Sequence, residues 1–105
     1  MYARLVLLFL SFANLVLASG YVRGTVIDSY LGEPVIYAEV KILDLNLTTL
    51  TDLDGRYSFE LSPGTYTVSV EYLGYAKKAI NGVQVEDGSV ELVDIWLDEE
   101  NEVIE

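Results

Sequence analysis

Hydrophobic and polar residues alternate along most of the chain after Tyr21, which is the pattern of β-strands with one buried face. The alternation is cleanest in the stretch from 65 to 72, whose apolar positions are Tyr66, Val68, Val70 and Tyr72. Residues 36–42 alternate in the same way. No segment of this region is long enough between turn signals to form a stable helix, so the pattern predicts an all-β fold.

Turn-forming residues interrupt the alternation about every eight to twelve positions, as in proteins built only of strands. The interruptions are residues 29–34, 52–55, 62–64 and 86–89. The pair Asn81-Gly82 favours a tight hairpin turn, and we expect it to separate strands at 76–80 and 83–85. The other predicted strands are 21–28, 36–42, 48–51, 57–61, 65–72 and 90–97. About seven short strands of this kind bury their apolar faces best as two packed antiparallel sheets, so we predict a seven-stranded antiparallel β-sandwich.

The beginning of the chain predicts export. Residues 1–18 combine Arg4, an apolar stretch up to Leu17 and small residues near Ala18, which is the pattern of a secretory signal peptide. The apolar stretch is shorter than the roughly 20 residues that span a bilayer, and a retained N-terminal anchor is the alternative. We therefore expect a mature protein outside the cytoplasm, secreted or in the cell envelope and not in a membrane. It would consist of a domain at 19–97 and an acidic tail at 98–105.

Charge and composition exclude several classes of function. Seventeen acidic and six basic residues give a net charge of −11, which disfavours nucleic acids and anionic membranes as partners. The chain contains no histidine and no cysteine, so Ser-His-Asp, Cys-His and zinc-dependent mechanisms are unavailable to it. Paired carboxylates could still hydrolyse a glycoside, but no pair is singled out by the sequence. We therefore predict that the protein is not an enzyme.

Tyrosine is abundant, and the strand pattern divides these residues into two groups. Tyr57, Tyr66 and Tyr72 fall on the inward side of their predicted strands and are expected in the core, whereas the facing of Trp96 stays open. The remaining candidates lie in loops or on outward positions, where aromatic rings stack on sugars or anchor protein partners. These candidate binding residues are Tyr30, Tyr37 and Tyr75.

Two acidic side chains and one asparagine form further candidate sites. Asp52 and Asp54, with Asp28 or Glu60 nearby, could offer carboxylate oxygens to calcium, the only cofactor that we consider. The alternative is a β-turn in which these aspartates accept hydrogen bonds from their own backbone. Asn46 begins the sequon Asn-Leu-Thr in a predicted loop, so it is a candidate for N-glycosylation in a host that modifies exported proteins.

The order of the turn motifs resembles the carboxypeptidase regulatory-like domain, a transthyretin-like or Cna-B-like β-sandwich. The most specific part is a Thr-Asp-x-x-Gly-x-Tyr element followed by Gly-x-Tyr, which here begins at Thr51 and at Gly64. The other motifs that carry the resemblance are 24–28, 32–35, 38–40 and Gly74-Tyr75, so it covers residues 21–97. What the resemblance implies is non-catalytic: accessory modules of secreted and surface proteins, some of which bind carbohydrate.

These observations lead to one main hypothesis and two alternatives. The main hypothesis is a secreted, non-catalytic module that binds or supports an extracellular partner, either a surface polysaccharide or an envelope protein. The first alternative is a structural subunit that self-associates, because exposed sheet edges offer unpaired backbone groups to a neighbouring strand. The second alternative is an acid-pair hydrolase.

Overall fold

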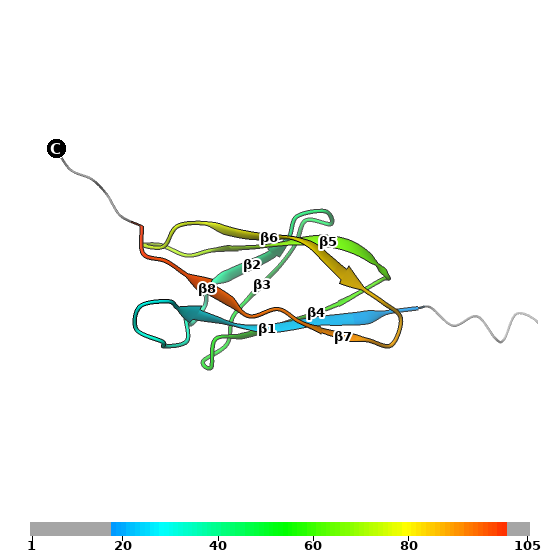
Figure 1. The fold of residues 1–105 in the computed structure, drawn as a ribbon, viewed down its shortest axis with the longest axis horizontal. Coiled ribbons are helices and arrows are strands. Elements are labelled where there is room, and N and C mark those ends of the chain that lie inside the picture. Colours follow the sequence, from blue (N-terminus) through cyan, green and yellow to red (C-terminus); the bar gives the residue numbers. More distant parts are fainter. Residues whose placement is uncertain (1–17, 101–105) are drawn as a thin grey trace, which may run out of the picture.

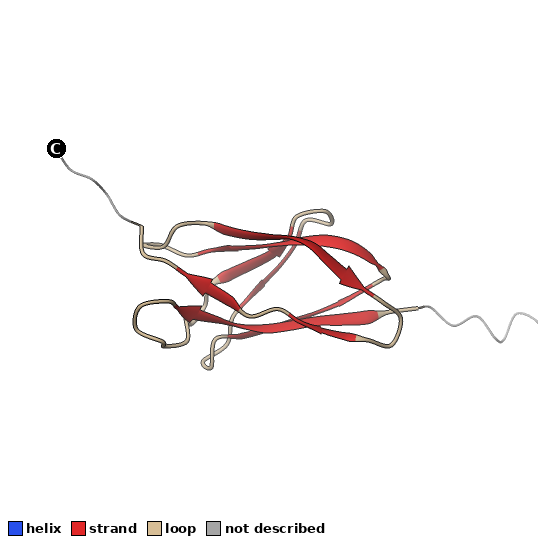
Figure 2. Ribbon diagram, in the orientation of Figure 1, coloured by secondary structure: helices blue, strands red, loops and turns tan. Residues whose placement is uncertain are grey.

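The computed structural model describes residues 18–100, and eight β-strands make up this part of the chain (Figure 1). The strands are β1 (Gly20–Asp28), β2 (Glu39–Ile42), β3 (Leu47–Leu50), β4 (Arg56–Leu61), β5 (Gly64–Glu71), β6 (Lys78–Val85), β7 (Val90–Leu92) and β8 (Ile95–Leu97). Figure 2 shows only strands and loops, and no helix among the residues described could cross a membrane. The predicted signal peptide, apart from Ala18, lies outside these residues, as do positions 101–105 of the acidic tail.

The strands form two sheets that pack face to face as a sandwich. In the first sheet β1 is central, with β4 on one side and β7 and β8 in succession on the other. The second sheet has the order β3-β2-β5-β6, and all its pairs are antiparallel. Because β7 and β8 run parallel to β1, the described chain enters the sandwich at one end and leaves it at the other (Figure 1).

The core lies between the two sheets and is built from the inward positions of the alternating strands. Each fully buried aliphatic side chain stabilises the fold by about 1.5–3 kcal/mol relative to an exposed one. The buried hydrophobic residues are Val22, Val26, Val35, Ala38, Val40, Ile42, Tyr57, Phe59, Leu61, Tyr66, Val68, Val70, Val83, Val85, Ile95 and Leu97. All of them lie between residues 22 and 97, so we expect the segment 19–105 to fold without the residues before it.

The all-β sandwich is confirmed, but the predicted strand count and the purely antiparallel pairing were wrong. Residues 18–100 form eight strands: the predicted strands 76–80 and 83–85 are one strand, β6, and the predicted strand 90–97 is interrupted at Val93 and Asp94 and becomes β7 and β8. Both pieces pair with β1 in parallel. Parallel pairing arises because the chain reaches β7 from the second sheet and enters beside the start of β1, in the same direction.

The prediction of a hairpin turn at Asn81-Gly82 was also wrong, because these residues form a β-bulge instead. Both residues are inside β6, where Gly82 has a φ of 71° and the register against β5 shifts between Tyr66 and Val68. The two residues form a bulge opposite Thr67. A glycine in the left-handed region satisfies a bulge as well as a hairpin turn, so the dipeptide alone does not distinguish the two.

Two further predictions need correction. The strand predicted at 36–42 begins only at Glu39, because Tyr37 has a φ of 60°, which lies outside the β region of regular strands. Tyr72 was placed in the core, but it lies beyond the end of β5 and is 38% exposed.

Candidate binding groove

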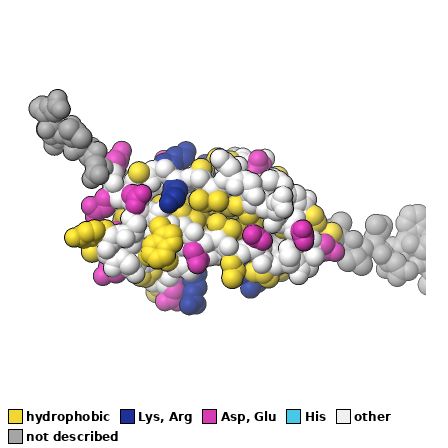
Figure 3. All heavy atoms as spheres, viewed as in Figure 1, with side chains coloured by type: hydrophobic (Ala, Val, Ile, Leu, Met, Phe, Trp, Pro, Cys, Tyr) yellow, Lys and Arg dark blue, Asp and Glu magenta, His cyan; other side chains and the backbone are white. Residues whose placement is uncertain are grey.

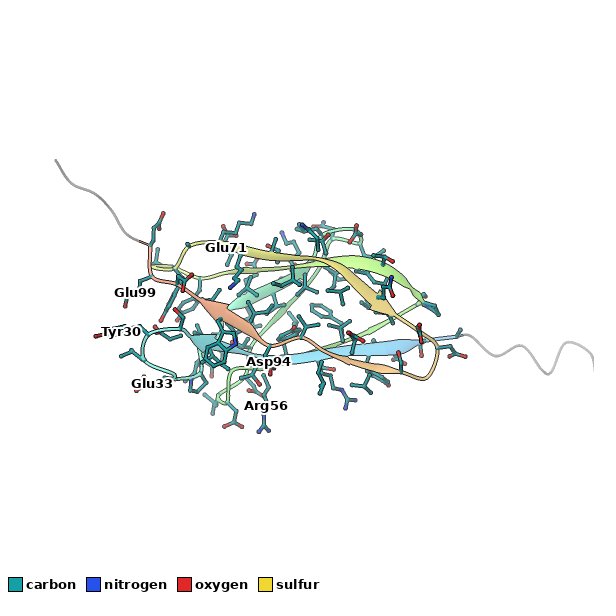
Figure 4. The ribbon with its side chains drawn as sticks, viewed as in Figure 1. Tyr30, Glu33, Arg56, Glu71, Asp94 and Glu99 are labelled. Atoms are coloured by element: carbon teal, nitrogen blue, oxygen red, sulfur yellow. The ribbon has the colours of Figure 1, made fainter. Side chains whose placement is uncertain are left out.

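A groove of about 520 Å³ lies on the outer face of the first sheet and is bordered by β3 and the β7–β8 junction. Its floor is formed by outward positions of β1 and β4, where Arg23 pairs with Ser58 and Thr25 with Arg56. Leu92, the neighbour of Arg23 in β7, borders one side, and Leu50 of β3 contributes a second apolar border. Figure 4 shows Arg56 projecting away from the start of β4, with Asp94 at the break between β7 and β8.

The β7–β8 junction is held against β1 by close backbone contacts. The N–H of Val93 donates to the carbonyl of Arg23 at 2.7 Å, and the Tyr57 hydroxyl donates to the Val93 carbonyl at 2.5 Å. A Cβ atom on Gly24 would lie 1.8 Å from that carbonyl oxygen, so only glycine fits here. Asp94 then accepts the Thr25 N–H at 2.9 Å, which fixes its carboxylate at the groove.

The groove contains both cationic and anionic side chains with unused hydrogen-bonding capacity. Arg23 lies over the ring of Tyr21, with its guanidinium carbon 4.7 Å from the ring centroid, a cation–π contact. Within residues 18–100 neither Arg23 nor Arg56 forms an ion pair within 4.0 Å. The hydrogen bonds to Asp94 and Asp52 occupy only Oδ1, which leaves the second carboxylate oxygen of each for a ligand. The groove can therefore donate and accept hydrogen bonds side by side.

The structure places the three candidate tyrosines in different settings. Tyr30 is 88% exposed and points outward from the β1–β2 loop (Figure 4). Tyr37 is 58% exposed in the loop before β2. Tyr75 is half-buried, packs against the core, and donates its hydroxyl to Asp28 at 2.7 Å. Tyr75 is thus part of the loop framework, and none of the three lines the groove.

Asp28 organises the end of the sandwich at which Tyr30 lies. Its side chain is buried, and one carboxylate oxygen accepts the backbone N–H groups of Tyr30 and Leu31, each at 2.8 Å. These bonds, with the Leu31 N–H foremost and the Tyr75 hydroxyl next, hold the pKa of Asp28 below its usual range. Donation to Asp28 in turn raises the pKa of Tyr75 to about 12.

The candidate calcium residues form the turn that was the alternative interpretation. Asp52 Oδ1 accepts the N–H groups of Asp54 and Arg56, each at 2.9 Å, and the bond from Arg56 is the main reason that its pKa is lowered. Between Ala18 and Glu100 no three acidic side chains gather closely enough to hold a metal ion.

Asn46, the candidate for N-glycosylation, is exposed in the β2–β3 turn with a φ of 53°, a conformation that asparagine tolerates.

The sequence prediction missed the residues that line the groove. Arg23, Arg56 and Asp94 were not singled out, because single charges on outward strand positions are common on any soluble domain. The sequence does show that Arg23 and Thr25 occupy alternate positions of one predicted strand, which places both side chains on the same face. Pairing β1 with β4 then makes Arg23 and Arg56 diagonal neighbours, whose Cβ atoms are about 7–8 Å apart.

Solved structures with the same fold come from several kinds of protein. The minor pilin of Streptococcus agalactiae matches with a TM-score of 0.63 and 13% identity, over 86% of this chain and 48% of the pilin. A type II cohesin–X–dockerin complex of Acetivibrio cellulolyticus matches with a TM-score of 0.61 and 20% identity, over 74% of this chain and 56% of that one. A candidate carbohydrate-binding protein of Bacteroides uniformis matches with a TM-score of 0.56 and 18% identity, over 73% and 40%. The chain thus spans about half the length of these proteins.

No curated protein matches the sequence. The match to a family is nevertheless nearly complete over the sandwich, because the carboxypeptidase regulatory-like domain aligns with residues 21–98. The matched range begins in β1 and ends just after β8, so it includes both sheets and the whole core. The chain belongs to the carboxypeptidase regulatory-like domain family.

Proposed function

We propose that the chain is a secreted, non-catalytic module of the cell envelope that binds an extracellular partner in the groove on its first sheet. The observation that carries this proposal is a groove in which Arg23 and Arg56 have no ion pair among the residues described, beside Asp52 and Asp94, each of which has one carboxylate oxygen free of hydrogen bonds within the same residues. A structural module needs no such arrangement. The fold shared with a candidate carbohydrate-binding protein supports the proposal without identifying the ligand.

The groove's chemistry supports binding rather than hydrolysis. An acid-pair hydrolase requires one carboxyl group whose pKa is raised so that it can donate a proton. Asp52 has the opposite property, because backbone N–H groups lower its pKa. The sequence contains no histidine and no cysteine, so neither can serve as a proton donor or nucleophile.

Of the two partner classes, a neutral sugar chain suits the groove better than a protein. Each sugar hydroxyl both donates and accepts hydrogen bonds, so adjacent guanidinium and carboxylate groups can satisfy it at once. Leu50 and Leu92 supply apolar contacts for the C–H faces of the rings. A polymer of acidic sugars would be repelled by a chain of net charge −11, on whose surface acidic side chains are widely spread (Figure 3).

Binding of neutral polysaccharides to residues 19–105 tests the proposal, measured by affinity electrophoresis and then by calorimetry. We expect R23A and R56A each to weaken binding about tenfold or more, the loss of a charge-assisted hydrogen bond. K41A is the matched control, because it removes one positive charge from the second sheet. Binding that survives both arginine substitutions would place the ligand elsewhere. Selective binding of an envelope protein that requires both arginines would identify the partner as protein.

Export is tested separately, by the N-terminus of the protein recovered outside its host cell. Mass spectrometry is expected to find a chain that begins at Ser19, because cleavage after Ala18 fits the signal-peptide pattern. A chain that retains residues 1–18 and sediments with membranes would instead establish the N-terminal anchor.

A further inference from the structure

β3 is an edge strand with an open side. Within residues 18–100 it pairs only with β2, and none of its four residues is buried. Its sequence, Leu-Thr-Thr-Leu, contains no charge and no proline. Such an edge presents unpaired backbone N–H and C=O groups to any strand that approaches it.

The other edges of the two sheets each carry a feature that hinders strand addition. β4 has charged outward residues, Arg56 and Glu60, and β6 contains the bulge at Gly82. The edge formed by β7 and β8 is broken at Val93-Asp94, and Lys78 Nζ already donates to the carbonyl of Trp96 at 2.9 Å. Charges, bulges and short strands are the usual means by which proteins prevent edge-to-edge pairing. β3 is short, at four residues, but it has neither a charge nor a bulge.

Backbone geometry shows which groups of β3 are free. Thr51, which follows the strand, donates its N–H to the Ala38 carbonyl at 2.9 Å and therefore faces β2. Hydrogen bonding alternates along an antiparallel strand, so Thr49 and Leu47 also face β2. The N–H and C=O groups of Thr48 and Leu50 consequently point to the open side.

We propose that two copies of this chain associate through β3, antiparallel about a two-fold axis at Thr49. In this register Thr48 of one copy lies opposite Leu50 of the other, and each such pair exchanges two backbone hydrogen bonds. The axis generates the pair twice, so every free group of Thr48 and Leu50 finds a partner. The result joins the two second sheets, each of four strands, into one continuous sheet.

Charge and symmetry favour a second copy as the occupant. Two chains of net charge −11 repel one another, and a contact between uncharged β3 strands places no acidic residue of either strand in the pairing. The same register places the two Thr49 residues opposite each other, a cross-strand pair that stabilises sheets. An isologous contact of this kind closes as a dimer rather than growing into a filament. Thr49 and Leu50 of β3 also line the groove, so a second copy and a groove ligand would share this border, but the β3 pairing is argued from the strand order and the backbone alone.

Cysteine crosslinking tests the register, since the chain has no cysteine of its own. The two Thr49 residues form a non-hydrogen-bonded pair, with Cα atoms about 4.5 Å apart, which is within disulfide range. T49C is expected to form a disulfide-linked dimer rapidly under mild oxidation. S58C, at an exposed position on the β4 edge, is the matched control and should crosslink much more slowly. Equal rates for T49C and S58C would overturn the proposal.

Sedimentation velocity of residues 19–105 tests the association itself. We expect a monomer–dimer equilibrium whose association constant falls about tenfold or more in T48P, because proline removes an N–H at the open edge and leaves the bonds to β2. S58P makes the equivalent change on β4 and should not weaken association. A strict monomer up to millimolar concentration, or association weakened by S58P and not by T48P, would refute the β3 dimer. If T48P does not fold, as judged by its melting curve, the crosslinking rates of T49C and S58C decide between dimer and monomer.

Discussion

Two aspartates begin loops in the same way but differ in what else they hold. Asp28 is the last residue of β1, and Asp52 lies just after β3. Oδ1 of each accepts two backbone N–H groups of its own loop. The second oxygen of Asp28 also accepts the hydroxyl of Tyr75, 47 positions away in the chain. Among the residues described, Asp52 forms hydrogen bonds only with residues within four positions of itself, and its side chain is exposed. One aspartate is a tertiary anchor and the other a local turn.

The difference shows how a single local motif can acquire a structural role. Around Asp28 the ends of both sheets meet: Ser29 Oγ donates to Asp98 at 2.5 Å, and the N–H of Glu100 donates to the carbonyl of Gly74 at 2.9 Å. The turn at Asp52 instead closes on itself, with its N–H donating to the Arg56 carbonyl at 3.0 Å. Loss of Asp28 should therefore affect the whole end of the sandwich, whereas loss of Asp52 should affect one turn.

The largest effect is expected from D28A. This substitution leaves three partly buried donors, the Tyr30 and Leu31 N–H groups and the Tyr75 hydroxyl, without their acceptor, so we expect the melting temperature to fall by about 10 °C. D28N retains an oxygen that accepts both N–H groups, so its melting temperature should fall by less than half as much as that of D28A. The measurement is thermal unfolding followed by circular dichroism. Equal losses in D28A and D52A would contradict the distinction between anchor and turn.

Y75F tests the tertiary part of the anchor alone. It removes the hydroxyl that donates to Asp28 but keeps the ring, which packs against the core. We expect the melting temperature to fall by about 4–8 °C, as for the loss of one hydrogen bond to a charged group. The matched control is Y30F, because Tyr30 is almost fully exposed and should tolerate the change. A Y75F protein as stable as Y30F would show that the bond contributes nothing measurable.

The pH dependence of stability tests the Asp28–Tyr75 hydrogen bond at both acidic and alkaline pH. Folding lowers the pKa of Asp28. Its contribution to stability is therefore complete above pH ~4 and is lost as the pH falls through the pKa of Asp28 in the folded protein. The pKa of Tyr75 is raised by folding to about 12, so its contribution is present below pH ~10 and is lost as the pH rises toward 12. Y75F should reduce the alkaline loss of stability without abolishing it, because burial also raises the pKa of Tyr57. Melting curves of both proteins from pH 2 to 11 make the test, and identical alkaline limbs would contradict it.

The sequence revealed the parts of this fold that local chemistry determines. Alternation at Tyr57 and Tyr66 correctly placed both rings in the core, and the turn residues at Asp52–Gly55 correctly marked a reversal. It did not reveal whether Asn81-Gly82 makes a turn or a bulge, because both need the same backbone conformation. That choice depends on which residues β5 places opposite, and this is tertiary information.

The candidate sites were harder to predict for the same reason. Tyr75 looked like an exposed aromatic, since nothing near it in the sequence indicates that its hydroxyl meets Asp28. Arg23 and Arg56 become neighbours only when β1 and β4 pair. The open side of β3 was foreseen in general terms, as an exposed edge, but identifying the edge required the strand order.

The smallest effects are expected at the Asp52 turn, where D52A and D54A separate the two interpretations of these carboxylates. If the turn is their whole role, D52A should lower the melting temperature by about 2–4 °C, since two N–H groups lose an exposed acceptor to water. D54A should change nothing, because among the residues described the Asp54 carboxylate accepts no hydrogen bond. A calcium site makes the opposite prediction: millimolar calcium would raise the melting temperature of the native sequence, and both substitutions would abolish that rise. Because Asp52 already uses one oxygen for its own turn, we expect calcium to leave the midpoint unchanged.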